Sequence, residues 1–125
     1  MLRKLALASV LVAASSAAVL AHGKNKPMHG GKVFDTGHHN LELDAAQGQL
    51  TLHVRHEDDK PEDVSKATAN ATVLADGKTY SVEMKPAAGG LLLGQGGFTS
   101  TKGATVVITL TMPDHKPEQA RFKLD

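Results

Sequence analysis

The stretch ATVLADGKTYSVEM, residues 71–84, decides the fold class of this chain. Its two halves flank the dipeptide Asp76-Gly77, and glycine readily adopts the positive φ that a two-residue hairpin turn requires. Apolar and polar residues alternate in these halves, as in strands with one buried face. The stretch therefore predicts a β-hairpin.

The same period of two continues on both sides of this hairpin. Further short runs of this kind lie at residues 32–34, 41–43, 50–54, 91–93, 104–110 and 120–124. Loops rich in glycine, proline or charge separate them. Seven or eight short strands with frequent turns predict an all-β fold, an antiparallel β-sandwich of immunoglobulin-like type. A small closed barrel is the alternative architecture.

The runs at 41–43 and 50–54 form a second expected hairpin, with its turn at residues 46–48. We expect Leu43 to lie opposite Leu50. In that register His38 and His53 become diagonal neighbours on the polar face. A slip of one residue would exchange the faces, so the prediction depends on the register.

The N-terminus has the features of a secretory signal peptide. Arg3 and Lys4 precede an uncharged stretch at 5–20, and residues 19–21, Val-Leu-Ala, fit cleavage after Ala21. Cleavage after Ala18 and an uncleaved N-terminal anchor are the alternatives. We therefore expect residues 1–21 to be a signal peptide, 22–28 a flexible leader and 29–125 a single domain, located in the periplasm or secreted.

Charge and cysteine content narrow the classes of partner. Without Arg3 and Lys4 the basic count falls from 14 to 12 against 13 acidic residues. This balance favours neither nucleic acid nor an anionic membrane as partner, and no membrane span is expected after processing. The chain has no cysteine, so neither a disulfide nor a thiolate metal ligand is available.

Histidine is the compositional anomaly, because six of the seven histidines lie near the start of the predicted mature chain. The residues of this group are His22, His29, His38, His39, His53 and His56. The expected hairpin places His39 and His56 together at the end of the core. Imidazole binds copper, zinc and nickel, so the group predicts a transition-metal site.

Copper is the first expectation, with zinc and nickel as alternatives. Cleavage after Ala21 would give His22 both an α-amine and an imidazole, a pair that chelates Cu(II). Met28-His29 offers a thioether beside an imidazole, a combination that suits Cu(I). The lack of cysteine argues against a structural zinc site, in which thiolates dominate.

Structural roles are the competing interpretation for each histidine taken singly. His38 and His39 can be ordinary hairpin residues, and His53 can be a cross-strand partner of a polar residue. We expect His115 to be structural, since only closure of the fold could bring it near the others. The acidic run at 57–63 lacks calcium-loop spacing and is expected to be a solvated loop.

A family resemblance points in the same direction. The run at 29–33, His-Gly-Gly-Lys-Val, is followed at 37–43 by Gly-His-His-Asn-Leu-Glu-Leu. This pattern resembles small periplasmic histidine-rich metal-binding proteins and the N-terminal segments of periplasmic adaptor subunits of heavy-metal efflux pumps. The resemblance implies metal handling in the cell envelope, with His29, His38 and His39 as the matching positions, and a metal efflux or delivery protein as partner.

The sequence therefore predicts a periplasmic transition-metal binding protein that buffers or delivers its ion. The alternative is a metal-free β-sandwich interaction module of the cell envelope, acting through an exposed strand edge. The two hypotheses differ in whether the histidines converge in space. We expect no enzymatic activity, because no nucleophile motif is present and a copper enzyme would have no evident substrate platform.

Overall fold

The computed structural model describes residues 26–98 and 102–125, and the predicted signal peptide lies outside them. These two segments contain eight β-strands and no helix, so they include no helix that could span a membrane. The strands are β1 (Lys32–Asp35), β2 (Asn40–Ala46), β3 (Gln49–Arg55), β4 (Thr68–Ala75), β5 (Lys78–Ala87), β6 (Leu91–Gln95), β7 (Thr105–Thr111) and β8 (Glu118–Lys123). Every pairing between them is antiparallel, which confirms the predicted fold class.

Alternation of buried and exposed residues builds the core. In β4 every second residue is buried, from Ala69 to Ala75, and β7 and β8 follow the same rule. The interior is mainly aliphatic, with Phe98 and Phe122 as its buried aromatic residues among those described. Because small alanines line one wall, the two halves of the sheet can pack closely over leucines from β2 and β3.

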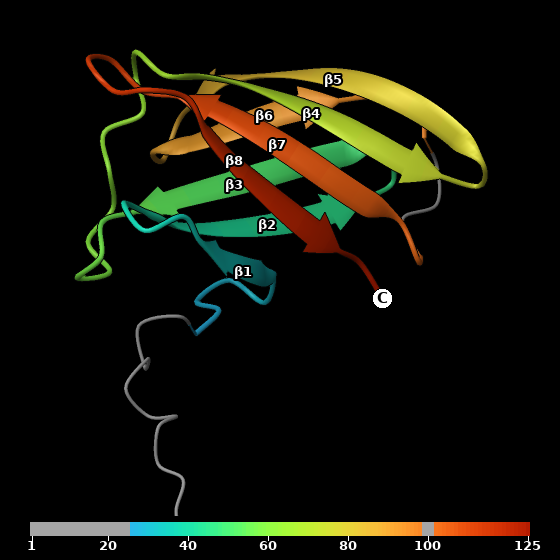
Figure 1. Cartoon of the computed structure of the whole chain (residues 1–125), viewed down its shortest axis with the longest axis horizontal. Helices are drawn as coiled ribbons and strands as arrows, with labels where there is room; N and C mark the ends of the chain where they lie inside the picture. The colour runs from blue at the N-terminus through green and yellow to red at the C-terminus, as the bar shows by residue number, and fades with distance from the viewer. Residues whose placement is uncertain (1–25, 99–101) are drawn as a thin grey trace, which may run out of the picture.

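The strand order is β1-β2-β3-β6-β5-β4-β7-β8 (Figure 1). If β2 to β8 are taken as strands A to G, the order reads A-B-E-D-C-F-G, which is the immunoglobulin order with the layers A-B-E and C-F-G joined through strand D. The long strand β5 joins the layers. Its residues up to Met84 pair with β4, whereas Lys85–Ala87 pair with β6. One continuous sheet therefore folds over on itself.

Both predicted hairpins are present, with two-residue turns. Asp76 and Gly77 have φ of 53° and 73°, and Gln47 and Gly48 have φ of 45° and 82°. Positive φ at both central positions is the type I′ geometry, whose twist matches that of the flanking strands. The turn at 47–48 is tighter than the sequence suggested.

The predicted β2–β3 register is wrong by two residues. Leu43 lies opposite Leu52, not Leu50, and Glu42 lies opposite His53. The tight turn lets pairing continue through Ala46, which shifts the strands by two positions. A shift of two preserves the faces, so the leucines still point into the core, but the partners of His53 change.

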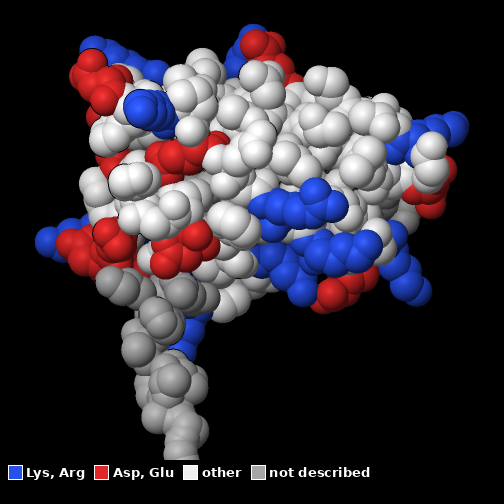
Figure 2. Space-filling model, in the orientation of Figure 1, with Lys and Arg blue, Asp and Glu red and all other residues white. Residues whose placement is uncertain are grey.

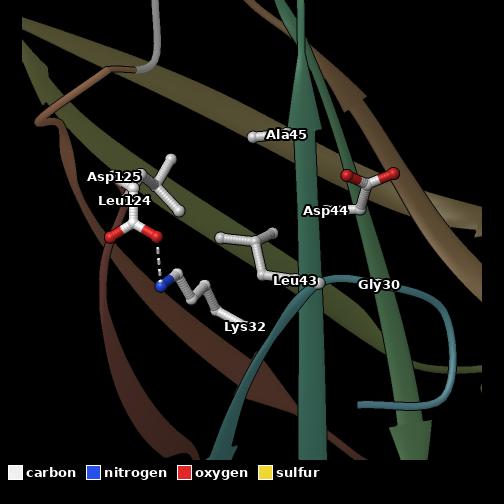
Figure 3. A pocket seen from close by; sticks show the side chains of 8 residues that line it. Gly30, Lys32, Leu43, Asp44, Ala45, Leu124 and Asp125 are labelled. Carbon is white, nitrogen blue, oxygen red and sulfur yellow. Dashed lines mark hydrogen bonds and ion pairs between the residues drawn. The ribbon is translucent and has the colours of Figure 1, made fainter.

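The first and last strands meet where the sheet comes round to itself. The rings of Phe34 on β1 and Phe122 on β8 have centroids 6.0 Å apart. Lys32 Nζ lies 2.7 Å from Asp125 Oδ2 across a shallow hollow that Leu43 and Leu124 also line (Figure 3). These contacts bring the molecule close to a barrel and place the loops preceding β2, β4 and β8 at one end (Figure 1).

Candidate functional site

A buried carboxylate fastens the segment before β1 to the outer face of the sheet. Glu42 is fully buried on β2 and accepts hydrogen bonds from the backbone N–H groups of Met28 (2.8 Å), His29 (2.7 Å) and Gly31 (2.8 Å). Arg55 Nη1 donates to the same carboxylate at 3.0 Å, and its Nη2 donates to the carbonyl of Lys26 at 3.1 Å. The end of the predicted flexible leader therefore contacts the domain, and residues 22–25 lie outside the described part.

The two glycines of the His-Gly-Gly motif make this docking feasible. A methyl group at Gly31 would lie 2.4 Å from the carbonyl oxygen of Leu43, which is closer than real contacts allow. Gly30 has a φ of +81°, a conformation that L side chains rarely adopt. The motif thus positions His29 through backbone geometry.

Glu42 stays ionised in this setting. Burial alone would raise the pKa of its carboxyl, but the hydrogen bonds from Met28, Gly31 and His29 outweigh burial and lower the pKa below its ordinary value. The ion pair with Arg55 adds a positive charge beside it. A buried charge with this many donors has a defined structural task, which is to hold the segment at 26–31.

The docked segment lays one histidine ring on another. The His29 and His53 rings are stacked with centroids 3.7 Å apart and an interplanar angle of 7°. Together with Met28, whose side chain is exposed, they line a hollow of about 360 Å³ that Asp59 and Leu91 also border. We call Met28, His29 and His53 the stacked pair site.

The surroundings favour a neutral imidazole at His53. Burial is the main cause of a lowered pKa for this ring, and the positive charge of a protonated His29 lowers it further. Glu42 and Asp44 act in the opposite direction but do not prevail. A neutral ring has a lone pair available, which is the state that a metal ion requires of histidine.

A second group of histidines and acids occupies the end of the molecule. His39, at the start of β2, is buried, and its Nδ1 lies 3.0 and 2.9 Å from the two carboxylate oxygens of Glu118. Its Nε2 lies 3.2 Å from Glu62 Oε2. The same oxygen of Glu62 lies 3.0 Å from Nδ1 of His56.

His115 completes this group. Its ring stands edge-on to that of His39, with centroids 6.2 Å apart, while the His56 ring is 6.3 Å from His39 on another side. We call His39, His56, His115, Glu62 and Glu118 the end cluster. Acidic side chains gather at this end of the molecule in Figure 2, and basic ones gather over the opposite half of the same face.

Sequence reasoning missed three members of the end cluster. Glu62 was assigned to a solvated loop, yet its side chain is only 18% exposed. No pattern in the sequence singles out Glu118, and the sequence predicts a structural role for His115 away from the other histidines, whereas both lie beside His39. The only available signal was the presence of acids close to histidines in the sequence, because the meeting of the three loops is a tertiary event.

The predicted site residues therefore divide into separate groups. His29 and His53 form one pair, and His39 and His56 meet at the end cluster as the strand pairing suggested. The prediction that His38 and His53 are diagonal neighbours is wrong, because the two-residue register shift puts Glu42 opposite His53. His38 is exposed in the β1–β2 loop, and its backbone N–H bonds to Thr36 Oγ1. His22 lies outside the described residues.

Neither group already surrounds an ion position. Within residues 26–98 and 102–125, no three or more His, Cys, Asp or Glu side chains are arranged to hold a metal ion as they stand. Ion binding at either place requires side chains to turn about their own bonds. Such turns are open to His29, Met28 and the half-exposed His56.

Comparison with models of known protein families, with curated proteins and with solved structures finds no match for this chain.

Proposed function

We propose that the chain binds a transition-metal ion, copper first and zinc or nickel next, and that it buffers or delivers this ion in the cell envelope. One observation carries the proposal. Five of the six histidines in the described segments have their rings beside another histidine ring, although they come from separate stretches of sequence. Binding of a metal ion would explain why these histidine rings lie next to one another.

The copper site of this proposal is the stacked pair site. Thioether and imidazole donors together are soft enough for Cu(I), which accepts two or three ligands. Met28, His29 and His53 line the same hollow, and two of them lie on the docked segment. Rotation of the His29 ring away from the stack would open both imidazoles toward the thioether.

Exchange with a partner fits the position of this site. Met28 is 59% exposed, so a bound ion would be accessible from solvent. The segment that carries Met28 and His29 is held mainly through backbone hydrogen bonds to one carboxylate, which leaves the two side chains free to turn. An open site with few ligands suits transfer of an ion better than permanent storage.

The test is a Cu(I) competition titration under reductant against a chromophoric chelator. We expect one equivalent to bind, with an affinity that falls at least about tenfold in His29→Ala, His53→Ala and Met28→Ala. His38→Ala serves as the matched control, because that histidine is exposed and outside both groups. His22→Ala reports on an N-terminal amine and imidazole site.

The outcomes separate the hypotheses. Loss of binding only in His22→Ala would move the site into the residues before Lys26. Binding equally strong in all variants, or only weak millimolar association, would contradict the copper proposal. The metal-free interaction module would then be the better account of the fold.

A further inference from the structure

We propose that His39, His56 and Glu62 of the end cluster form a second metal site, which takes a borderline divalent cation such as Zn(II). The stacked pair site contributes no residue to it. A negative result at one site therefore does not affect the proposal for the other site.

Donor spacing already approaches that of a coordination sphere. Glu62 Oε2 lies 3.2 Å from His39 Nε2 and 3.0 Å from His56 Nδ1. In a tetrahedral site with metal–ligand bonds of about 2.0–2.1 Å, neighbouring donor atoms are roughly 3.3 Å apart. Each imidazole nitrogen thus lies nearly as far from the shared carboxylate oxygen as neighbouring ligands on one ion do. The two rings, with centroids 6.3 Å apart, would have to approach each other by about 1 Å.

Glu118 contacts the Nδ1 side of His39, where a metal-binding histidine commonly donates a hydrogen bond to a carboxylate. Both of its oxygens face Nδ1 of His39, and the Thr36 hydroxyl donates to one of them. With a carboxylate there, Nδ1 can donate its proton to Glu118, which leaves Nε2, on the side of Glu62, available to an ion. The ring is thereby aimed at the proposed ion position.

The charges of the end cluster are suited to a dication. Glu62 and Glu118 are both well shielded from solvent, with 18% and 7% of their side chains exposed. Ionised carboxylates carry negative charge and only accept hydrogen bonds, so positive charge placed between these side chains is favoured. A bound dication would take the place of the contacts that Glu62 makes with His39 Nε2 and His56 Nδ1, and it would balance the charges of the two carboxylates.

Access and a further ligand are available nearby. The His56 side chain is 49% exposed and leaves one side of the group open to solvent. His115 lies with its ring centroid 6.2 Å from that of His39, whereas two imidazoles on one tetrahedral ion have centroids roughly 5 Å apart. A movement of about 1 Å would bring His115 into position as a fourth ligand.

Donor chemistry separates the two sites. The end cluster offers nitrogen and carboxylate oxygen and no sulfur, a set that favours Zn(II), Co(II) or Ni(II) over Cu(I). The stacked pair site includes a thioether and favours Cu(I). The molecule would thus bind two different ions at two places.

The test uses Co(II) as a spectroscopic substitute for Zn(II). We expect one equivalent of Co(II) to give visible absorption bands of tetrahedral or five-coordinate type, which one equivalent of Zn(II) displaces. Glu62→Gln and His56→Ala should abolish the bands or weaken Zn(II) binding at least about tenfold. Glu118→Gln, behind the ligand, should weaken binding by about tenfold and shift the bands.

Control variants distinguish the loss of a metal ligand from a defect in folding. Glu57→Gln changes an exposed acid of the same loop, and His29→Ala changes the copper site; both should leave the Co(II) spectrum unchanged. The variants are compared only where their far-ultraviolet circular dichroism matches the parent chain. Half-exposed His56 tolerates replacement, so His56→Ala keeps the proposal falsifiable if a Glu118 variant fails to fold.

Bands that persist in both Glu62→Gln and His56→Ala would overturn the proposal. Absence of Zn(II) or Co(II) binding by the parent chain would do the same. If Zn(II) and Co(II) do not bind while Cu(I) still binds at Met28, His29 and His53, only the proposal of a second site is contradicted. If Cu(I) does not bind while Zn(II) and Co(II) bind at the end cluster, only the copper proposal is contradicted.

Discussion

At the scale of single residues, Glu42 connects the fold to the site. It lies in the middle of a strand whose first four residues are all buried, whereas an ordinary strand of a sandwich alternates. The departure arises because the segment at 26–31 covers the outer face and satisfies the carboxylate. The hydrogen bond from the His29 backbone to this carboxylate holds the residue where its ring stacks on His53.

The first prediction concerns Glu42→Gln. Removal of the charge leaves Arg55 buried beside a weaker partner, so we expect a loss of about 3 kcal/mol in the free energy of unfolding at pH 7. Urea denaturation measures this loss. Asp44→Asn, an exposed acid on the same strand and face, is the control and should change stability by less than about 0.5 kcal/mol.

The pH dependence of the same variant has a defined sign. Because the folded-state pKa of Glu42 lies below 4.5, its ionised form stabilises the fold above that pH. This contribution is lost as the pH falls through the lowered folded-state pKa. The metal-free parent chain should therefore lose more stability on acidification below pH 4.5 than Glu42→Gln does, and parallel curves would contradict the assigned role.

The second prediction concerns the motif glycine. In Gly31→Ala the new methyl group meets backbone, which cannot move aside as a side chain can, so we expect a loss of about 2 kcal/mol and weaker docking of the segment. Gly97→Ala is the matched control, since a methyl group there meets only Tyr80 ring atoms at 3.8 and 3.9 Å. Equal stability of the two variants would show that the segment does not dock as described.

At the scale of elements, β5 and β6 set the shape of the molecule. β6 crosses β5 at the point where β5 leaves β4, and Gly94 lets the two backbones come close. A methyl group at Gly94 would lie 2.7 Å from Val82 Cγ1 and 2.8 Å from the carbonyl oxygen of Glu83. The sheet can fold over on itself here because Gly94 has no side chain and the strands can approach closely.

The third prediction is that Gly94→Ala destabilises the fold by about 2–3 kcal/mol, measured by thermal or urea unfolding. Both neighbouring strands would have to shift to accept the methyl group. Replacement of the adjacent exposed Gln95 by Ala should have little effect and serves as the control. If Gly94→Ala and Gln95→Ala unfold alike, the close crossing is not as tight as described.

Elements also show what the sequence could predict and what it could not. Asp76-Gly77 predicted its hairpin correctly because the turn chemistry is local. The β2–β3 register was wrong because Ala46, which the sequence placed in the turn, stays in the strand and pairs with Gln49. His115 and Glu118 could not be assigned to a site, since only the packing of β8 against the opposite layer brings them to His39.

At the scale of the whole molecule, an immunoglobulin-like sandwich brings loops from distant parts of the chain to one end. The loops before β2 and β4 supply His39 and Glu62, and Glu118 is the first residue of β8 at the same end of the molecule (Figure 1). The docked segment at 26–31 adds the proposed copper site on the outer face of the sheet. A chain without cysteine can thus present two sets of metal donors of different softness.

The fourth prediction is that bound ions stabilise the folded chain separately. A ligand that binds only the folded state at a free concentration of 100 times its Kd adds about 2.7 kcal/mol. Cu(I) should therefore raise the melting temperature, and Zn(II) should raise it further. Glu62→Gln should abolish the Zn(II) increment alone, and His53→Ala the Cu(I) increment alone; loss of both increments in either variant would contradict two independent sites.

The central claim is that Met28, His29 and His53 bind copper, and histidine-ring NMR tests it most directly. Long-range ¹H–¹⁵N spectra of the chain are followed during an anaerobic Cu(I) titration, together with the methionine ε-methyl signals. We predict that the ring nitrogens of His29 and His53 and the Met28 methyl shift together up to one equivalent, while His38 does not change. Shifts confined to other histidines, or no shift at one equivalent, would contradict the claim.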